Sequence, residues 1–163
     1  MTARGVLFAL NAKQVEELSE AEDDESVLAV ITKLEERWDR RWLAELDKAW
    51  DAIHRSLTDG RLEYDNGEYP LKLAILGGLQ LHEGDTYIVS LTTKEQVEDV
   101  AYALARIDMS KFRARYDRID PDDYDAELGD LDFAYTWSNL LETVKLYRRA
   151  ADAGRAVVFT VDL

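Results

Sequence analysis

The fold of this chain is decided by its last ten residues, Gly154-Arg-Ala-Val-Val-Phe-Thr-Val-Asp-Leu163. In a β-strand, successive side chains point to opposite faces of the sheet. Here both alternating sets carry apolar residues, and β-branched and aromatic side chains dominate, as is typical of strands. The apolar density predicts that this strand lies in the interior of a sheet.

Working outward from this strand, Gly154 ends the preceding segment, which is predicted to be the longest helix. Its apolar residues recur three and four apart, as they do on one face of a helix: Phe133, Trp137, Leu140, Leu141, Val144 and Tyr147. Two further apolar runs, Gly5–Leu10 and Thr86–Leu91, indicate strands. Each is followed by residues typical of a helix start, namely Asn11 with Gln14, and Thr92 or Thr93 with Glu95 or Gln96.

These elements predict an α/β fold, with α+β as the alternative. We expect a small mixed sheet of about three to four strands, covered by several helices. The length of 163 residues suits one domain spanning residues 1–163.

A second apolar series lies between the first two predicted strands. It consists of two stripes, and within each stripe the residues are three and four apart, which predicts either two helices joined near Arg40–Arg41 or one bent helix: Val27, Ile31, Leu34 and Trp38, then Leu43, Leu46, Trp50, Ile53 and Leu57. Within it, Asp47, Asp51 and His54 are expected on one helical face. A carboxylate one turn from a histidine can orient it for acid–base work or weak metal binding. The alternative is that the three side chains only support the helix and the following loop.

Part of this series closely resembles a known family. The stretches Leu46-Asp-Lys-Ala-Trp-Asp-Ala-Ile-His-Arg-Ser-Leu-Thr-Asp-Gly60 and Pro70-Leu-Lys-Leu-Ala-Ile-Leu-Gly-Gly78 resemble the YfbM-like family of uncharacterised bacterial proteins, and the later segments agree in order and spacing. Many members have an Ile-Tyr-Pro element where this chain has Pro121-Asp-Asp-Tyr-Asp125. The resemblance implies a single-domain α/β fold and no established activity.

The charge and the cysteine content of the chain exclude several classes of partner and reaction. The chain holds 34 acidic and 20 basic residues, a formal net charge of −14. The electric field of a protein with this negative charge repels nucleic acids and anionic membranes and attracts basic proteins. The absence of cysteine excludes disulfides, thiolate nucleophiles and cysteine-bound zinc or iron–sulfur clusters. We expect a cytoplasmic protein with no cofactor, no resident metal, and no nucleic-acid or membrane partner.

The acidic residues gather in two segments, Glu16–Glu25 and Asp117–Asp132, of which the second is predicted to be a loop. Within that loop, Asp122, Asp123, Tyr124 and Asp125 are candidates for binding a basic partner, with the tyrosine as an aromatic anchor. Tyr124 also interrupts the ligand spacing of a calcium loop.

A tryptophan pair lies among arginines near the middle of the chain. Trp38 and Trp42, interleaved with Arg37, Arg40 and Arg41, have the composition of a base-stacking surface. The acidic field opposes polyanions, so we expect both rings in the core.

Two functional hypotheses follow. The first is a non-enzymatic cytoplasmic binding protein, of the inhibitor or immunity type, that neutralises a basic partner through its acidic loops. The alternative is a small-ligand or metal-dependent enzyme centred on Asp47, Asp51 and His54.

Overall fold

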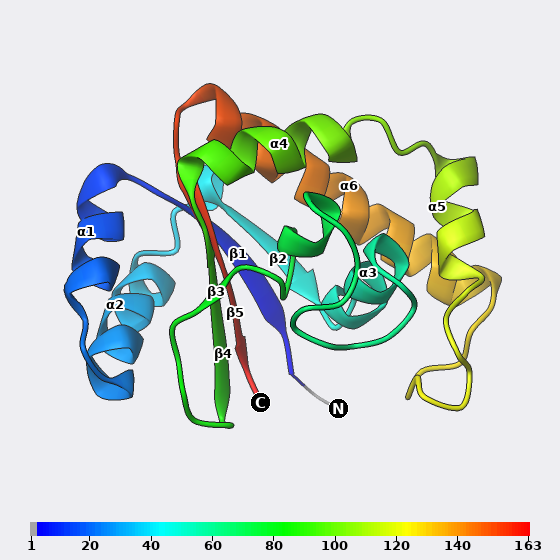
Figure 1. Cartoon of the computed structure of the whole chain (residues 1–163), viewed down its shortest axis with the longest axis horizontal. Helices are drawn as coiled ribbons and strands as arrows, with labels where there is room; N and C mark the ends of the chain where they lie inside the picture. Colours follow the sequence, from blue (N-terminus) through cyan, green and yellow to red (C-terminus); the bar gives the residue numbers. More distant parts are fainter. Residues whose placement is uncertain (1–2) are drawn as a thin grey trace.

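A computed structural model of the chain describes residues 3–163. It contains a five-stranded sheet with helices on both faces (Figure 1). In chain order the elements are β1 Gly5–Leu10, α1 Ala12–Glu20, α2 Asp24–Arg37, the 3-10 helix η1 Arg40–Trp42, β2 Leu43–Asp47, α3 Trp50–Leu57, the 3-10 helix η2 Leu71–Leu73, β3 Leu79–Gln80, β4 Tyr87–Thr92, α4 Lys94–Leu104, α5 Met109–Tyr116, α6 Asp130–Asp152 and β5 Ala156–Asp162.

The C-terminal strand is the centre of the sheet, as predicted. The strand order is β2-β1-β5-β4-β3, and Ala156 to Val161 are all buried. The expected combination of helices over one small sheet in a single domain is confirmed. The sheet has five strands instead of three to four, and all its pairings are antiparallel where a mixed sheet was expected.

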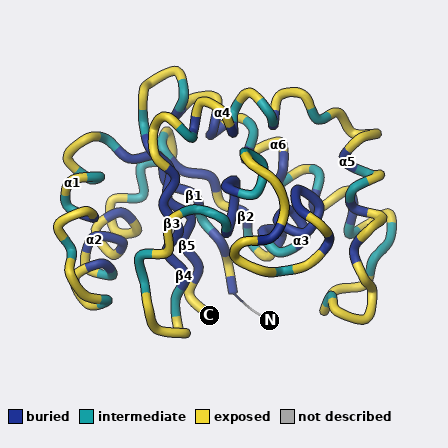
Figure 2. Tube along the Cα trace, in the orientation of Figure 1, coloured by how far each residue is buried: buried dark blue, intermediate teal, exposed yellow. Residues whose placement is uncertain are grey.

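Alternating side chains of the central strands pack into two separate hydrophobic cores, one on each face of the sheet. Leu7 of β1 and Phe159 of β5 point to the core shared with α3, α4, α5 and α6. Their neighbours Phe8 and Val158 point to the core shared with α1 and α2. In Figure 2 the buried trace runs through the sheet, whereas the outer turns of the helices and the loop before α6 are exposed. The sheet is therefore a partition with apolar residues on both sides.

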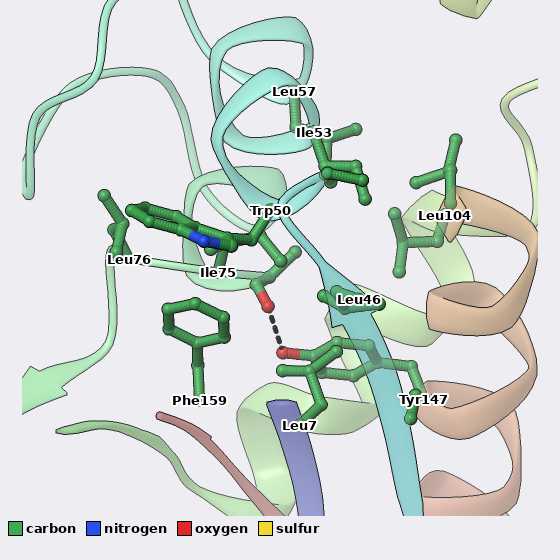
Figure 3. Close-up of a cluster of buried hydrophobic side chains, with 14 of the residues drawn as sticks. Leu7, Leu46, Trp50, Ile53, Leu57, Ile75, Leu76, Leu104, Tyr147 and Phe159 are labelled. Carbon is green, nitrogen blue, oxygen red and sulfur yellow. Dashed lines mark hydrogen bonds between the residues drawn. The ribbon is translucent and has the colours of Figure 1, made fainter. Parts of the chain in front are cut away.

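The larger core is anchored by aromatic side chains from three elements. Trp50 of α3 lies next to Phe159 of β5, with 5.6 Å between ring centroids (Figure 3). Trp50 also donates its indole N–H to the carbonyl of Ala3 at 3.2 Å. Tyr147 of α6 is fully buried and donates its hydroxyl to the carbonyl of Ala74 at 2.7 Å. Each polar atom on these large rings therefore has a partner, as burial requires.

One predicted element is wrong. Leu43 to Asp47 is the edge strand β2, paired antiparallel with β1, and not part of a helix. Leu43 and Leu46 are three residues apart, which mimics helical spacing, yet they lie in the two different cores on opposite faces of the sheet. Asp47 ends the strand with φ of 48°, in the left-handed region that interrupts regular structure. Pairing with β1 outweighs the local pattern.

Candidate functional site

Asp47, Asp51 and His54 do not share a helical face. Asp47 is the last residue of β2, whereas Asp51 and His54 belong to α3. Asp47 accepts a hydrogen bond from the hydroxyl of Tyr135 at 2.7 Å and pairs with Arg4 at 3.4 Å. The predicted arrangement of the three residues is therefore corrected, because a strand end and a turn separate Asp47 from the helix.

His54 organises the loop that follows α3. Its ring is only 1% exposed, and its Nε2 lies 2.9 Å from Oδ1 of Asn66. The Asn66 amide donates to Thr58, Asp59 and the carbonyl of Arg61. Burial lowers the pKa of His54 below its ordinary value, so the neutral imidazole is favoured at neutral pH. These contacts match the structural alternative considered for His54.

Arg55 connects α3 to the loop between α5 and α6, residues 117–129, which we call the acidic loop. Its guanidinium is almost fully buried and contacts the carboxylates of Asp51 at 2.5 Å and Asp123 at 2.7 Å. It also donates to the Asp123 carbonyl at 3.1 Å and lies 5.6 Å from the centroid of the Tyr124 ring. A buried cation needs such partners to offset lost hydration. The two sets of candidate residues, far apart in sequence, thus meet at this arginine.

Three tyrosine hydroxyls near Arg55 donate hydrogen bonds to carboxylates, those of Tyr116 and Tyr124 to Asp132 and that of Tyr135 to Asp47. The hydroxyls of Tyr116 and Tyr124 donate to Oδ2 of Asp132 at 2.7 and 3.0 Å. The hydroxyl of Tyr135 accepts the backbone N–H of Lys48 at 3.1 Å. Burial is the main reason that the pKa of Tyr135 rises to about 12 and that the pKa of Tyr124 is raised as well. All three hydroxyls therefore stay protonated donors at neutral pH.

These elements enclose a pocket of about 320 Å³. It lies between the start of the chain, α3, the acidic loop and the first turns of α6, and it is lined by Ala3, Lys48, Trp50, Asp51, Tyr124, Asp125, Ala126, Asp132 and Tyr135. We call it the acidic pocket, because its described lining residues include three carboxylates, Asp51, Asp125 and Asp132, and one cation, Lys48. Burial raises the pKa of Asp51, opposed by the hydrogen bond from Arg55. The pocket offers carboxylates beside aromatic surface, which is suited to an organic cation.

The comparisons with known proteins place the chain in a family. A family model described as a domain of unknown function (DUF1877) matches residues 1–160. The chain belongs to this family. Its structure is similar to the crystal structure of YfbM from Escherichia coli, a protein of unknown function, with a TM-score of 0.73, 21% sequence identity, and coverage of 97% of this chain and 99% of that chain. The predicted resemblance is confirmed. No curated protein matches the chain.

At this level of identity, the likeness of the DUF1877 chain to YfbM concerns the fold. In residues 3–163, no three His, Asp or Glu side chains gather as a metal site would require. No helix of the described chain has the length and apolarity needed to cross a bilayer.

Four pocket or near-pocket residues of the DUF1877 chain escaped the sequence reasoning, namely Lys48, Arg55, Asp132 and Tyr135. The spacing of Asp51 and Arg55, four apart, would have indicated an ion pair on α3. Nothing in the sequence indicated that this pair reaches Asp123, which is 68 residues away.

Proposed function

We propose that this protein is a non-enzymatic binding module that takes a lysine or arginine side chain of a basic partner protein into the acidic pocket. The observation that carries the proposal is the convergence of Asp51, Asp125 and Asp132 on one cavity beside Tyr124 and Tyr135. The setting we propose is the bacterial cytoplasm, and the role is of the inhibitor or immunity type.

The pocket has the size and chemistry for one side chain. Small-molecule sites begin at about 300 Å³, so a cavity of about 320 Å³ suits a single long side chain better than a large cofactor. The tyrosine surfaces can cover an aliphatic stem, and the carboxylates can pair with the terminal cation.

The exposed acidic residues near the pocket can attract a basic partner electrostatically and guide its approach. Asp122 and Asp125 are exposed and form no salt bridge within residues 3–163, so their charge is available to a partner. Asp123 differs, because it already binds Arg55. A like-signed cluster of this kind raises the association rate of an oppositely charged protein and loses strength as salt is added.

The alternative enzyme hypothesis gains no support from the geometry. It requires Asp47, Asp51 and His54 to converge on one cavity. Asp51 lines the acidic pocket, Asp47 borders it through Tyr135, and His54 is directed to Asn66.

The test compares two charge-matched double variants as bait in a native bacterial lysate at low and moderate salt, with retained proteins identified by mass spectrometry. Asp122→Asn/Asp125→Asn removes the charge of Asp125, which lines the pocket, and that of Asp122, three residues earlier in the same loop. Glu98→Gln/Asp152→Asn removes two exposed charges on α4 and α6.

We expect the wild type and the α4/α6 control to retain the same basic protein at low salt, and the pocket variant to lose it. The captured protein is then purified and titrated against all three forms. Equal affinity of the pocket variant and the control, or no basic protein retained by the wild type, contradicts the proposal.

A further inference from the structure

Three arginines converge at the opposite end of the sheet from the acidic pocket. Arg37 ends α2, Arg41 lies in η1 and Arg155 precedes β5. None forms a salt bridge within the described residues 3–163, although their neighbour Arg40 pairs with Glu45 at 3.6 Å. In a chain with 34 acidic residues against 20 basic ones, three unpaired guanidinium groups in one place require an explanation.

The three arginines line a small cavity of about 100 Å³. We call it the arginine pocket, and its lining comprises Phe8, Ala9, Asn11, Gln14, Leu34, Arg37, Asp39, Arg41, Trp42 and Arg155. It lies where β1 ends and β5 begins, so strands paired in the centre of the sheet hold its floor. The end of α2, η1 and the start of β5 therefore position the three arginines around the cavity.

Two of the guanidinium groups lie over the ring of Trp42. The guanidinium carbon of Arg155 lies 3.6 Å from the centroid of the Trp42 ring, and that of Arg41 lies 5.3 Å from it. Stacking on an aromatic face leaves the N–H groups in the guanidinium plane free to bind oxygen atoms. Within the described part of the chain, the Arg155 side chain makes one hydrogen bond, which is 3.4 Å long and goes to the carbonyl of Ala9.

The remaining polar groups of the cavity add donors. The side-chain oxygens of Asn11 and Gln14 accept the backbone N–H groups of each other's residues at the start of α1. Their amide NH₂ groups form no hydrogen bond within residues 3–163 and are available to a ligand. Asp39 is the one carboxylate among the described lining residues, and it accepts the backbone N–H of Arg41 at 3.2 Å. The cavity thus contains three cations against one anion.

Mutual repulsion leaves this cluster in need of a counter-charge. Burial lowers the pKa of Arg155, and the charges of Arg41 and Arg37 lower it further against the attraction of Asp39. The position of Arg37 at the C-terminus of α2 favours a cation there. That placement does not explain why Arg41 and Arg155 gather beside it.

We propose that the arginine pocket binds a phosphate-sized oxyanion, either inorganic phosphate or the phosphoryl group of a small phosphomonoester. Arginine forks match the spacing of phosphate oxygens and donate two hydrogen bonds at once. The small cavity volume suits one phosphoryl group, and the net charge of −14 of the whole chain repels a polyanion. The Trp42 and arginine combination noted in the sequence therefore serves a compact anion.

The test follows the Trp42 indole N–H by NMR while inorganic phosphate, methyl phosphate or acetate is added to the full chain at constant ionic strength. We expect a saturable shift with phosphate at a Kd of about 1 mM or tighter, and a much weaker response to acetate. Tighter binding of methyl phosphate assigns the site to a phosphomonoester, and equal or weaker binding assigns it to inorganic phosphate.

Three variants make the result specific. Arg155→Met and Arg41→Gln should each weaken phosphate binding by about tenfold or more, because each removes a charged pair of donors. Arg148→Gln removes an exposed arginine elsewhere on α6 and should leave binding unchanged. Arg41 is exposed, so Arg41→Gln carries the test if Arg155→Met does not fold. No saturable shift by about 20 mM phosphate, or equal binding by the Arg41 and Arg148 variants, overturns the proposal.

Discussion

Replacing Arg55 by methionine should destabilise the fold substantially while keeping most of the apolar stem of the side chain. The change removes the ion pairs with Asp51 and Asp123 and the bond to the Asp123 carbonyl. Asp123 is 60% exposed and can return to water, whereas Asp51 is only 18% exposed. The main cost is therefore the Asp51 carboxylate left without its partner.

Breaking a buried ion pair costs about 3 to 5 kcal/mol, and the exposure of Asp123 puts this case near about 3 kcal/mol. For a chain of this size, that loss corresponds to a fall in Tm of about 6 to 12 °C. The free energy of unfolding is measured by urea denaturation at about pH 7.5, with an unchanged slope as the check that the denatured state is similar.

The loss in free energy of unfolding caused by Arg55→Met should also depend on pH. Burial already raises the pKa of Asp51 in the folded protein, and loss of Arg55 raises it further. A carboxyl whose folded pKa is raised is most favourable below the unfolded pKa, and its contribution is lost as pH rises through the folded pKa. The difference between wild type and variant should therefore shrink by about 1 kcal/mol or more when both are measured at about pH 5.5.

Arg113→Met is the matched control. Arg113 also contacts one carboxylate four residues away, Asp117 at 2.9 Å, and one in another element, Asp130 at 3.0 Å, but its side chain is 38% exposed. Exposed pairs contribute little to stability, because water screens the two charges. If the Arg55 and Arg113 variants lose equal stability, or the Arg55 cost is independent of pH, burial of the Arg55 bridge does not control its energy.

Three further changes test the loop after α3. Gly60→Ala should cost about 1 to 3 kcal/mol, because Gly60 has φ of +93° and a Cβ there would lie 2.8 Å from the carbonyl oxygen of Arg118; urea denaturation measures the loss. The lowered pKa of His54 gives stability that is present above the ordinary histidine pKa of 6.5 and is lost as pH falls through the folded value, so His54→Gln should flatten the stability profile below that pH. The pKa of Asp59 is lowered to about 2, chiefly by the hydrogen bond from Arg61; Arg61→Gln should move it back toward 3.8 in a carboxyl NMR titration, and an unchanged value would assign the shift to other donors.

Elements with local signals were predictable from the sequence. The apolar strand at Ala156–Asp162, the long helix before it, and the cap at Asn11 each depend on residues within one segment, and the structure contains all three. Strand β3 has only the two residues Leu79 and Gln80, too few for any periodic pattern. The antiparallel strand order depends on pairings between distant segments, which local sequence patterns do not encode.

The candidate site was predictable in its parts but not in its assembly. Asp51 and the loop residues Tyr124 and Asp125 were each singled out, for two different functions, and the structure brings them into one cavity. Their meeting depends on Arg55, whose second partner is 68 residues away. His54 was selected for the chemistry that imidazole can perform, yet burial against Asn66 determines its role.

The two charged pockets lie at opposite ends of the same strand. Ala3, just before β1, lines the acidic pocket, and Asn11, just after β1, lines the arginine pocket. The six residues of β1 span roughly 20 Å at about 3.3 Å per residue. Because exposed charges are largely screened beyond about 8 Å at physiological salt, a charged ligand in one pocket should not change the electrostatic potential in the other pocket.

Any coupling between a basic partner and phosphate would then have to pass through the sheet itself. Since β5 is buried on both faces and β1 pairs with it along its whole length, we expect saturating phosphate to leave the affinity for the basic partner unchanged at physiological salt.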